Sequence, residues 1–263
     1  MLLLLGAGAV SAPMTAPAAA QVSGEGSERF TVWVEGGPVW QSRNEVRVPN
    51  EPEATLFSLR SLAGSGPWPA ARLTVGWRFR DRQEVRLLLA PLSITETAGS
   101  GEAIRFAGQD LEPQLPITAT YTFNSWRASW RYRLHEGGST AGWIGFTAKV
   151  RDAVVSLEQE VEPPSEGRGD LRRGRTTDVG FVPLLHLSGV WRIAPVWTLM
   201  GEFDGLAGGP GRAFDVSAQV ERRIGDRWWI RGGYRTVEGG ADVDQVRNFA
   251  WLHYLVVGGE WRR

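Results

Sequence analysis

A histidine and a serine that lie two residues apart are the strongest candidates for chemistry in this sequence. His186 and Ser188 fall in a segment of alternating polar and apolar residues, 178–193, and a tight turn leads from it into a second such segment containing Glu202. If the two segments pair symmetrically about this turn, His186 lies opposite Glu202 and Ser188 opposite Met200, with opposed Cβ atoms about 5 Å apart. Glu202 would then orient the imidazole, His186 would act as base, and Ser188 would be the nucleophile of an acyl transfer.

The same residues also have a structural interpretation, in which they form a hydrogen-bonded polar cluster and none of them is catalytic. The sequence favours this interpretation, and with it a protein that is not an enzyme. It contains no phosphate-binding loop, no zinc-ligand spacing and no dinucleotide fingerprint, so we expect neither a cofactor nor a metal ion.

The elements that must position these residues are strands. In the stretch YTFNSWRASWRYRL, residues 121–134, aromatic or small apolar residues alternate from Trp126 onward with arginine or serine, and successive strand side chains point to opposite faces. The chain also has 33 glycines and 15 prolines, which would interrupt long helices. Ten alternating segments are predicted as strands: 29–40, 70–80, 83–95, 117–134, 141–157, 178–193, 196–205, 212–224, 227–237 and 247–261.

Short and long connections alternate strictly between these segments. The tight ones are Asp81-Arg82, His135 to Gly138, Ile193 to Pro195 and Gly225-Asp226, and the long polar ones are 41–69, 96–116, 158–177, 206–211 and 238–246. This rhythm is typical of an up-and-down barrel in an outer membrane, which has short periplasmic turns and longer external loops. An even strand number and a long first connection both place the termini at the periplasmic end.

The abundance of tryptophan indicates which face meets lipid. A closed barrel of ten strands has an interior only slightly larger than that of an eight-stranded barrel, which side chains just fill, and it has no room for 13 tryptophans. The aromatic face is therefore expected outside, in lipid. In segment 117–134 the apolar residues are odd-numbered before Asn124 and even-numbered after Ser125, so we predict a bulge at this point that restores the facing.

The polar faces of these strands then line the lumen. The predicted lumen residues are Arg72, Arg78, Glu84, Arg127, Arg131, Lys149, Arg151, Glu202, Asp204, Asp215 and Glu221. Buried charges are tolerated when they are paired, so one interpretation is a network of ion pairs that fills and stiffens the barrel. The other is a narrow polar conduit or pocket for a small solute. Ten strands leave too little lumen for a general porin, which needs about sixteen.

The ends of the chain and its composition give the cellular context. Residues 1–20 are uncharged, apolar and end in three alanines, as in a secretory signal peptide, and the absence of cysteine is compatible with export. Basic and acidic residues number 29 each, so no nucleic-acid partner is expected. Arg168, Arg172, Arg173 and Arg175 in the third long connection could bind the phosphates of lipopolysaccharide.

The final segment, NFAWLHYLVVGGEWRR, resembles the carboxy-terminal assembly signal of outer-membrane β-barrel proteins of Gram-negative bacteria, although Arg262 and Arg263 follow the last aromatic residue. The resemblance covers the whole mature chain. It implies outer-membrane lipid, lipopolysaccharide and the barrel assembly machinery as partners.

Two enzyme families of this architecture are also relevant. The His186-x-Ser188 element is similar to that of lipid A deacylases, barrel enzymes that hydrolyse an ester of lipopolysaccharide, although Gly189 stands where that family carries asparagine. Omptin-type proteases need an Asp-His pair two residues apart. Leu184 occupies the position two residues before His186, so that pattern does not match.

The sequence therefore predicts a signal peptide over 1–20 and, over 21–263, an all-β, up-and-down antiparallel transmembrane barrel of about ten strands. The expected function is structural or narrow solute-passing, without catalysis. The alternative is a lipid-modifying esterase that uses Ser188, His186 and Glu202. A third alternative is a secreted soluble β-barrel that binds a hydrophobic ligand.

Overall fold

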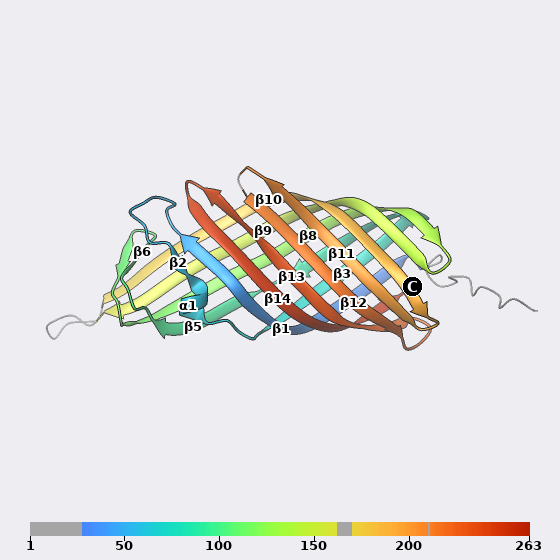
Figure 1. Cartoon of the computed structure of the whole chain (residues 1–263), viewed down its shortest axis with the longest axis horizontal. Coiled ribbons are helices and arrows are strands. Elements are labelled where there is room, and N and C mark those ends of the chain that lie inside the picture. The colour runs from blue at the N-terminus through green and yellow to red at the C-terminus, as the bar shows by residue number, and fades with distance from the viewer. Residues whose placement is uncertain (1–27, 162–169, 210) are drawn as a thin grey trace, which may run out of the picture.

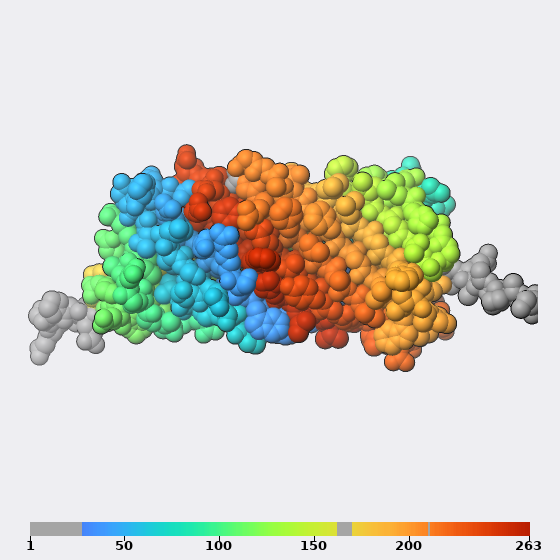
Figure 2. All heavy atoms as spheres, viewed as in Figure 1, coloured from blue at the N-terminus to red at the C-terminus, as the bar shows by residue number. Residues whose placement is uncertain are grey.

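The computed structural model describes residues 28–161, 170–209 and 211–263, which form a closed antiparallel barrel (Figure 1). Its long strands are β1 (Phe30–Arg47), β3 (Trp68–Arg80), β4 (Gln83–Ala90), β5 (Ser93–Gly99), β8 (Pro116–Gly137), β9 (Thr140–Val161), β10 (Asp170–Ala194), β11 (Trp197–Gly208), β12 (Gly211–Arg223), β13 (Trp228–Val243) and β14 (Val246–Arg262). Each pairs with its neighbour in the ring, and β14 closes the barrel against β1. Figure 2 shows this closing seam, with β14 in red beside β1 in blue.

The number of strand positions in the ring is ten, as the sequence predicts. β4 and β5 occupy one position, because both pair with β8 in a single register that includes Ala90↔Ser125 and Ser93↔Thr122. Pro91 and Leu92 interrupt the strand between them, and proline cannot donate a hydrogen bond to the ladder. The predicted all-β, up-and-down barrel is confirmed.

Several strands run further than predicted. β9 extends to Val161 and β10 begins at Asp170, while most of the expected loops 206–211 and 238–246 belong to β11, β12, β13 and β14. Outside the membrane both faces of a strand can be polar, so the alternation that reveals a strand disappears although the backbone pairing continues.

The outer wall carries the apolar belt expected of a membrane barrel. Large apolar side chains are exposed on it all around the ring, including Trp77, Trp130, Phe146, Phe181, Trp191, Trp228, Trp251 and Val257. Leaving so much contiguous apolar surface in water would be costly, whereas hydrocarbon accepts it. This arrangement gives no support to the alternative of a secreted soluble barrel.

The predicted bulge at Asn124-Ser125 is wrong. β8 keeps an unbroken register against β9 from Thr118↔Glu158 to Arg133↔Trp143, and the register shifts only between Arg133 and His135. The odd-numbered residues of β8 therefore face inward along this whole length, and Ile117 and Tyr121 are buried inside the barrel. The interior changes from polar to apolar along the strand, and the backbone does not need to reverse its facing.

The interior consequently has two parts. The half next to the tight turns holds charged side chains, and the half at the long connections holds a hydrophobic cluster that includes Val39, Leu92, Ile94, Ile117, Tyr121, Leu157 and Leu252. Four short elements cover this cluster: β2 (Phe57–Ser58) with the helix α1 (Leu59–Ala63), and a hairpin of β6 (Ile104–Phe106) and β7 (Gln109–Leu111). No helix among the described residues is long and apolar enough to cross a membrane.

Candidate functional site: the ion-pair layer and the His186 cluster

Charged residues from most strands of the ring meet in the lumen as a layer of ion pairs, which we call the ion-pair layer. Its arginines are Arg72, Arg86, Arg127, Arg131, Arg231, Arg235 and Arg262, and its carboxylates are Glu35, Glu84, Glu202, Asp204, Asp215, Glu221 and Glu260. Positive and negative groups are equal in number. They lie on inward positions because strand side chains alternate and the apolar alternates take the lipid face.

Asp215 on β12 is the centre of this layer. Its carboxylate is 2.6 Å from Arg235 Nη1 on β13, 2.7 Å from Arg127 Nη2 on β8 and 3.5 Å from Arg72 Nη2 on β3. β8 and β3 are well separated from β12 around the ring, so these contacts cross the lumen. The Asp215 side chain is 3% exposed, and its charge is compensated entirely by groups on other strands.

A second crossing lies beside the first. Glu202 on β11 accepts from Arg86 on β4 at 2.5 Å, and Arg86 also donates to Glu84 at 2.8 Å on its own strand. Arg131 on β8 donates to the other oxygen of Glu84 at 2.8 Å. Three strands, β4, β8 and β11, are thereby connected through side chains inside the barrel.

The residues nearest the chain ends form a separate group. Arg262 donates to Glu260 and Glu221 at 2.5 Å each, and Arg231 pairs with the same two carboxylates. Arg231 also lies over the Trp33 ring, 4.2 Å from its centroid. Arg262 is one of the two C-terminal arginines that depart from the assembly-signal pattern. Its guanidinium group forms ion pairs inside the lumen.

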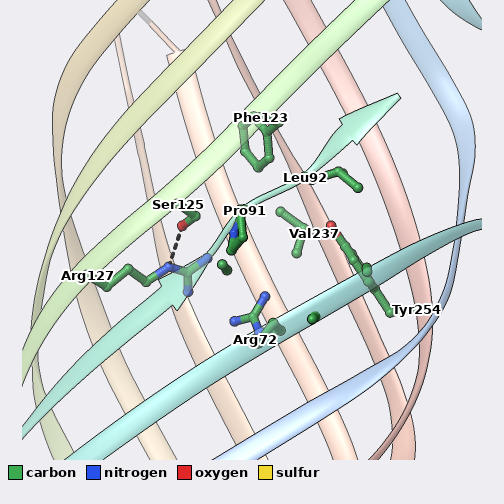
Figure 3. A pocket seen from close by; sticks show the side chains of 11 residues that line it. Arg72, Pro91, Leu92, Phe123, Ser125, Arg127, Val237 and Tyr254 are labelled. Carbon is green, nitrogen blue, oxygen red and sulfur yellow. Dashed lines mark hydrogen bonds between the residues drawn. The ribbon is translucent and has the colours of Figure 1, made fainter. Parts of the chain in front are cut away.

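The ion-pair layer packs tightly against the apolar half of the interior (Figure 3). Arg72 and Arg127 lie on one side of a small cavity, with Leu92, Val237 and Tyr254 on the other, and the cavity volume is about 10 Å³. A cavity needs roughly this volume to hold one water molecule. Little space is therefore left where the two halves meet.

His186 belongs to this interior and faces the lumen. Its side chain is 4% exposed, its Nδ1 lies 2.9 Å from Asp204 Oδ1, and its Nε2 lies 3.0 Å from Ser188 Oγ. With the proton on Nδ1, the imidazole donates to Asp204 and accepts from the Ser188 hydroxyl. These are the contacts of a serine, histidine and aspartate triad.

The predicted partner of His186 is corrected by this geometry. β10 pairs with β11 so that His186 lies opposite Asp204 and Ser188 opposite Glu202, two residues away from the expected register. The position of the turn is the reason, because Ala194 pairs with Trp197 and the turn residues are Pro195 and Val196, further along the chain than predicted. A register shift of one residue between Arg192 and Ala194 then sets the final pairing. Asp204 therefore takes the place expected for Glu202, and Glu202 joins the ion-pair layer.

Asp204 and Ser188 also form hydrogen bonds with other side chains of the interior. Asp204 also accepts from Thr147 Oγ1 at 2.7 Å and from Arg127 Nη1 at 3.1 Å. Arg131 Nη1 lies 3.4 Å from Ser188 Oγ, and the Arg131 guanidinium lies over the Trp143 ring. The serine, histidine and aspartate are thus continuous with the ion-pair layer.

The structure places the other predicted lumen residues at different depths. Arg72, Glu84, Arg127, Arg131, Asp204, Asp215 and Glu221 are in the ion-pair layer, and Arg78 lies on the same face of β3 as Arg72, toward the tight turn. Lys149 and Arg151 lie on the apolar side of the layer, where Arg151 pairs with Asp178.

Six of the fourteen residues of the ion-pair layer were not predicted from the sequence: Glu35, Arg86, Arg231, Arg235, Glu260 and Arg262. Alternation could have found several of them. Arg231 and Arg235 have the same parity as the buried Trp229 and Val237, and each of these four positions faces inward.

The arginines of the third long connection are partly engaged. Arg172 pairs with Glu112 at 3.0 Å and Arg173 with Glu158 at 2.7 Å. Arg168 lies outside the described residues. The suggested binding of lipopolysaccharide phosphates at this end stays a prediction.

The barrel, its lipid-facing belt and its charged interior define the class: the chain has the fold of Gram-negative outer-membrane β-barrel proteins. The outer-membrane protease OmpT from Escherichia coli is similar over 93% of this chain and 100% of its own, with a TM-score of 0.55 and 8% sequence identity. Neisserial surface protein A (TM-score 0.37, 12% identity, 89% and 97% covered) and the Pseudomonas putida toluene transporter TodX (0.36, 9%, 93% of each) are more distant. No protein-family model matches the sequence, and no curated protein matches it significantly.

Proposed function

We propose that the protein is a structural outer-membrane barrel with a closed lumen, exported with the aid of residues 1–20, which lie outside the described residues. The single observation that carries the proposal is the position of Asp215, which binds arginines of β3 and β8 across the lumen and an arginine of the neighbouring strand β13. A solute would have to separate these buried charges in order to pass.

The energetics of the ion-pair layer support a permanently closed state. Removing one partner of a buried ion pair typically costs about 3–5 kcal/mol, because the other charge is left uncompensated in a medium of low dielectric constant. Asp215 has three such partners. Of the two roles considered for the charged lumen, this favours stiffening over solute passage.

Electrical conductance in planar bilayers tests the proposal. We expect the purified wild-type barrel to give no stable conductance steps, whereas a sixteen-stranded porin inserted in the same way gives large ones. The neutral double substitution Arg127→Ala with Asp215→Ala should open a small, measurable conductance, because it removes one of the pairs that cross the lumen.

The matched control is Arg223→Ala with Asp226→Ala, which removes an equally neutral but exposed pair at a tight turn. This variant should stay as silent as the wild-type protein. Long-lived conductance steps from the wild-type protein would overturn the closed-lumen proposal.

An ester hydrolase is the second candidate function, and the contacts of His186 with Ser188 and Asp204 favour it. If Ser188 is a nucleophile, Ser188→Ala and Asp204→Asn should each change the acylation pattern of lipid A in cells that produce the protein. Under the structural proposal, mass spectrometry of lipid A should give the same species for wild type, Ser188→Ala and cells without the protein.

A further inference from the structure

One wall of the barrel is incomplete next to the apolar half of the interior. The pairing of β10 with β11 ends at Leu185↔Gly205, although β10 continues to Asp170 along β9 on its other side. β11 ends at Gly208, and the tip of the β11–β12 hairpin reaches only partway along the long axis, whereas β9 and β10 reach its end (Figure 1). Among the described residues, the segment of β10 before Leu185 therefore has no strand partner on the β11 side.

A cavity of about 410 Å³ lies beside this opening and extends into the barrel. Gly180, Val182, Leu206 and Ala213 line it at the opening, and residues of β8, β9, β13 and β14 line it further in. This volume falls within the range of about 300–1,000 Å³ that small-molecule sites occupy in proteins.

The cavity exists because small residues face the interior here. Gly180, Gly208, Ala213, Gly239 and Ala250 contribute little or no side chain to it, whereas larger residues fill the interior elsewhere. A Cβ atom added at Gly208 would meet no heavy atom within 4 Å. The remaining lining is mainly apolar and includes Phe123, Val182, Leu206, Val237 and Leu252.

The lining also holds charged groups: the ion pairs Arg151–Asp178 and Arg212–Glu238, and Lys149. Lys149 pairs with Val182 of β10 in the sheet register, at the edge of the opening, and is 3% exposed. Its amino group lies 4.9 Å from the Phe123 ring centroid, and none of the described carboxylates forms an ion pair with it. Its neighbour Arg151 differs, because Asp178 compensates that guanidinium. Asp178 and Glu238 are already paired with arginines, so the buried amino group of Lys149 lines the cavity without a carboxylate partner among the described residues and suits an anion.

The outer surface beside the opening is suited to contact with lipid. Val179 and Phe181 on β10 point outward and are each 68% exposed. These residues continue the apolar belt up to the level of the opening. An apolar molecule in the membrane could therefore reach the cavity without passing through the ion-pair layer.

We infer that this cavity binds a single-chain amphiphile with an anionic head, such as a fatty acid. The head lies at Lys149 and the chain lies against Val182, Leu206, Val237 and Leu252. The inference goes beyond the proposed structural function and does not depend on whether the lumen conducts.

Native mass spectrometry of the barrel released from neutral maltoside micelles tests this inference, with dodecanoate, dodecanol and dodecylammonium as probes. We expect one dodecanoate per wild-type barrel, bound at least ten times more tightly than dodecylammonium. Lys149→Met should weaken dodecanoate at least tenfold and leave dodecanol unchanged, while Lys149→Arg should retain dodecanoate.

Two further variants complete the test. Gly208→Trp places a ring in the cavity and should abolish binding of dodecanoate and dodecanol alike. Arg133→Met removes an inward cation of β8 near the tight turns and should change neither. Equal affinity of the wild-type barrel for dodecanoate and dodecylammonium would overturn the inference even if no variant folded, and so would undiminished dodecanoate binding by Lys149→Met. Bilayer conductance is a separate readout, so a failure here leaves the closed-lumen proposal to its own test.

Discussion

At the scale of single residues, the ion-pair layer depends on exact charge balance around a few carboxylates. Asp215 holds three guanidinium groups, and its side chain is 3% exposed, so water cannot replace it as their partner. Arg72 and Arg235 also contact Glu35, which distributes charge between strands. Loss of one carboxylate would therefore remove a counter-charge from several arginines at once.

The substitution Asp215→Asn tests this dependence with almost no change in shape. We expect it to lower the free energy of unfolding by about 3–5 kcal/mol, because an amide cannot compensate the buried guanidinium charges. Urea titration of the barrel in lipid vesicles, followed by tryptophan fluorescence and heat-modifiable gel mobility, measures the change.

Asp226→Asn is the control for this substitution. Asp226 is fully exposed at a tight turn and lies 3.6 Å from Arg223, so its replacement should leave the urea midpoint unchanged. Equal effects of the two substitutions would mean that the layer contributes nothing specific to stability.

At the scale of elements, β8 crosses two different environments while keeping one facing. Between Asn124 and the tight turn its inward residues are Ser125, Arg127 and other polar groups. Between Asn124 and the long connection they are Phe123 and Tyr121. The outward face changes in the opposite sense, from aromatic residues to Thr118, Thr120 and Thr122, which bond hydroxyls of β5. The strand therefore leaves the apolar belt near Asn124 and continues as the wall of an ordinary water-exposed barrel with an apolar core.

Adjacent alanine substitutions on β8 test this facing. Ile117→Ala removes a fully buried side chain from the hydrophobic cluster and should cost about 2–5 kcal/mol of unfolding free energy. Thr118→Ala removes an outward hydroxyl that bonds Thr97 at 2.9 Å and should cost less than about 1 kcal/mol. The same urea titration compares them, and a larger effect at Thr118 would show that the outward face, not the interior, holds this part of the barrel together.

The sequence predicts those features of the fold that alternation and connection length encode. The ten strand positions and the outward aromatic residues follow from them, as does the inward placement of Arg127 and Asp215. The inward facing of the apolar residues of β8 before Asn124 could not be predicted, because alternation alone does not say whether a segment is surrounded by lipid or by water. The pairing of His186 with Asp204 depends on the position of one turn and on a register shift of one residue beside it, which residue types do not specify.

At the scale of the whole molecule, the two halves of the interior determine which end can bind ligands. The ion-pair layer fills the half next to the tight turns and the termini, and the hydrophobic cluster with its covering hairpin fills part of the other half. The cavity beside Lys149 lies in the half at the long connections. A barrel inserted with short turns in the periplasm would therefore present this end to the exterior.

Epitope insertion at two turns tests this orientation. The β6–β7 turn at Ala107 and Gly108 has positive φ at both residues and belongs to the cover of the hydrophobic cluster, whereas Asp226 lies in the turn between β12 and β13. We expect an antibody to label intact cells when the epitope follows Gly108, and to need permeabilised cells when it follows Asp226. Heat-modifiable gel mobility confirms that each insertion leaves the barrel assembled. Labelling of intact cells through the Asp226 insertion alone would reverse the orientation, and would move the amphiphile site at Lys149 to the periplasmic side of the membrane.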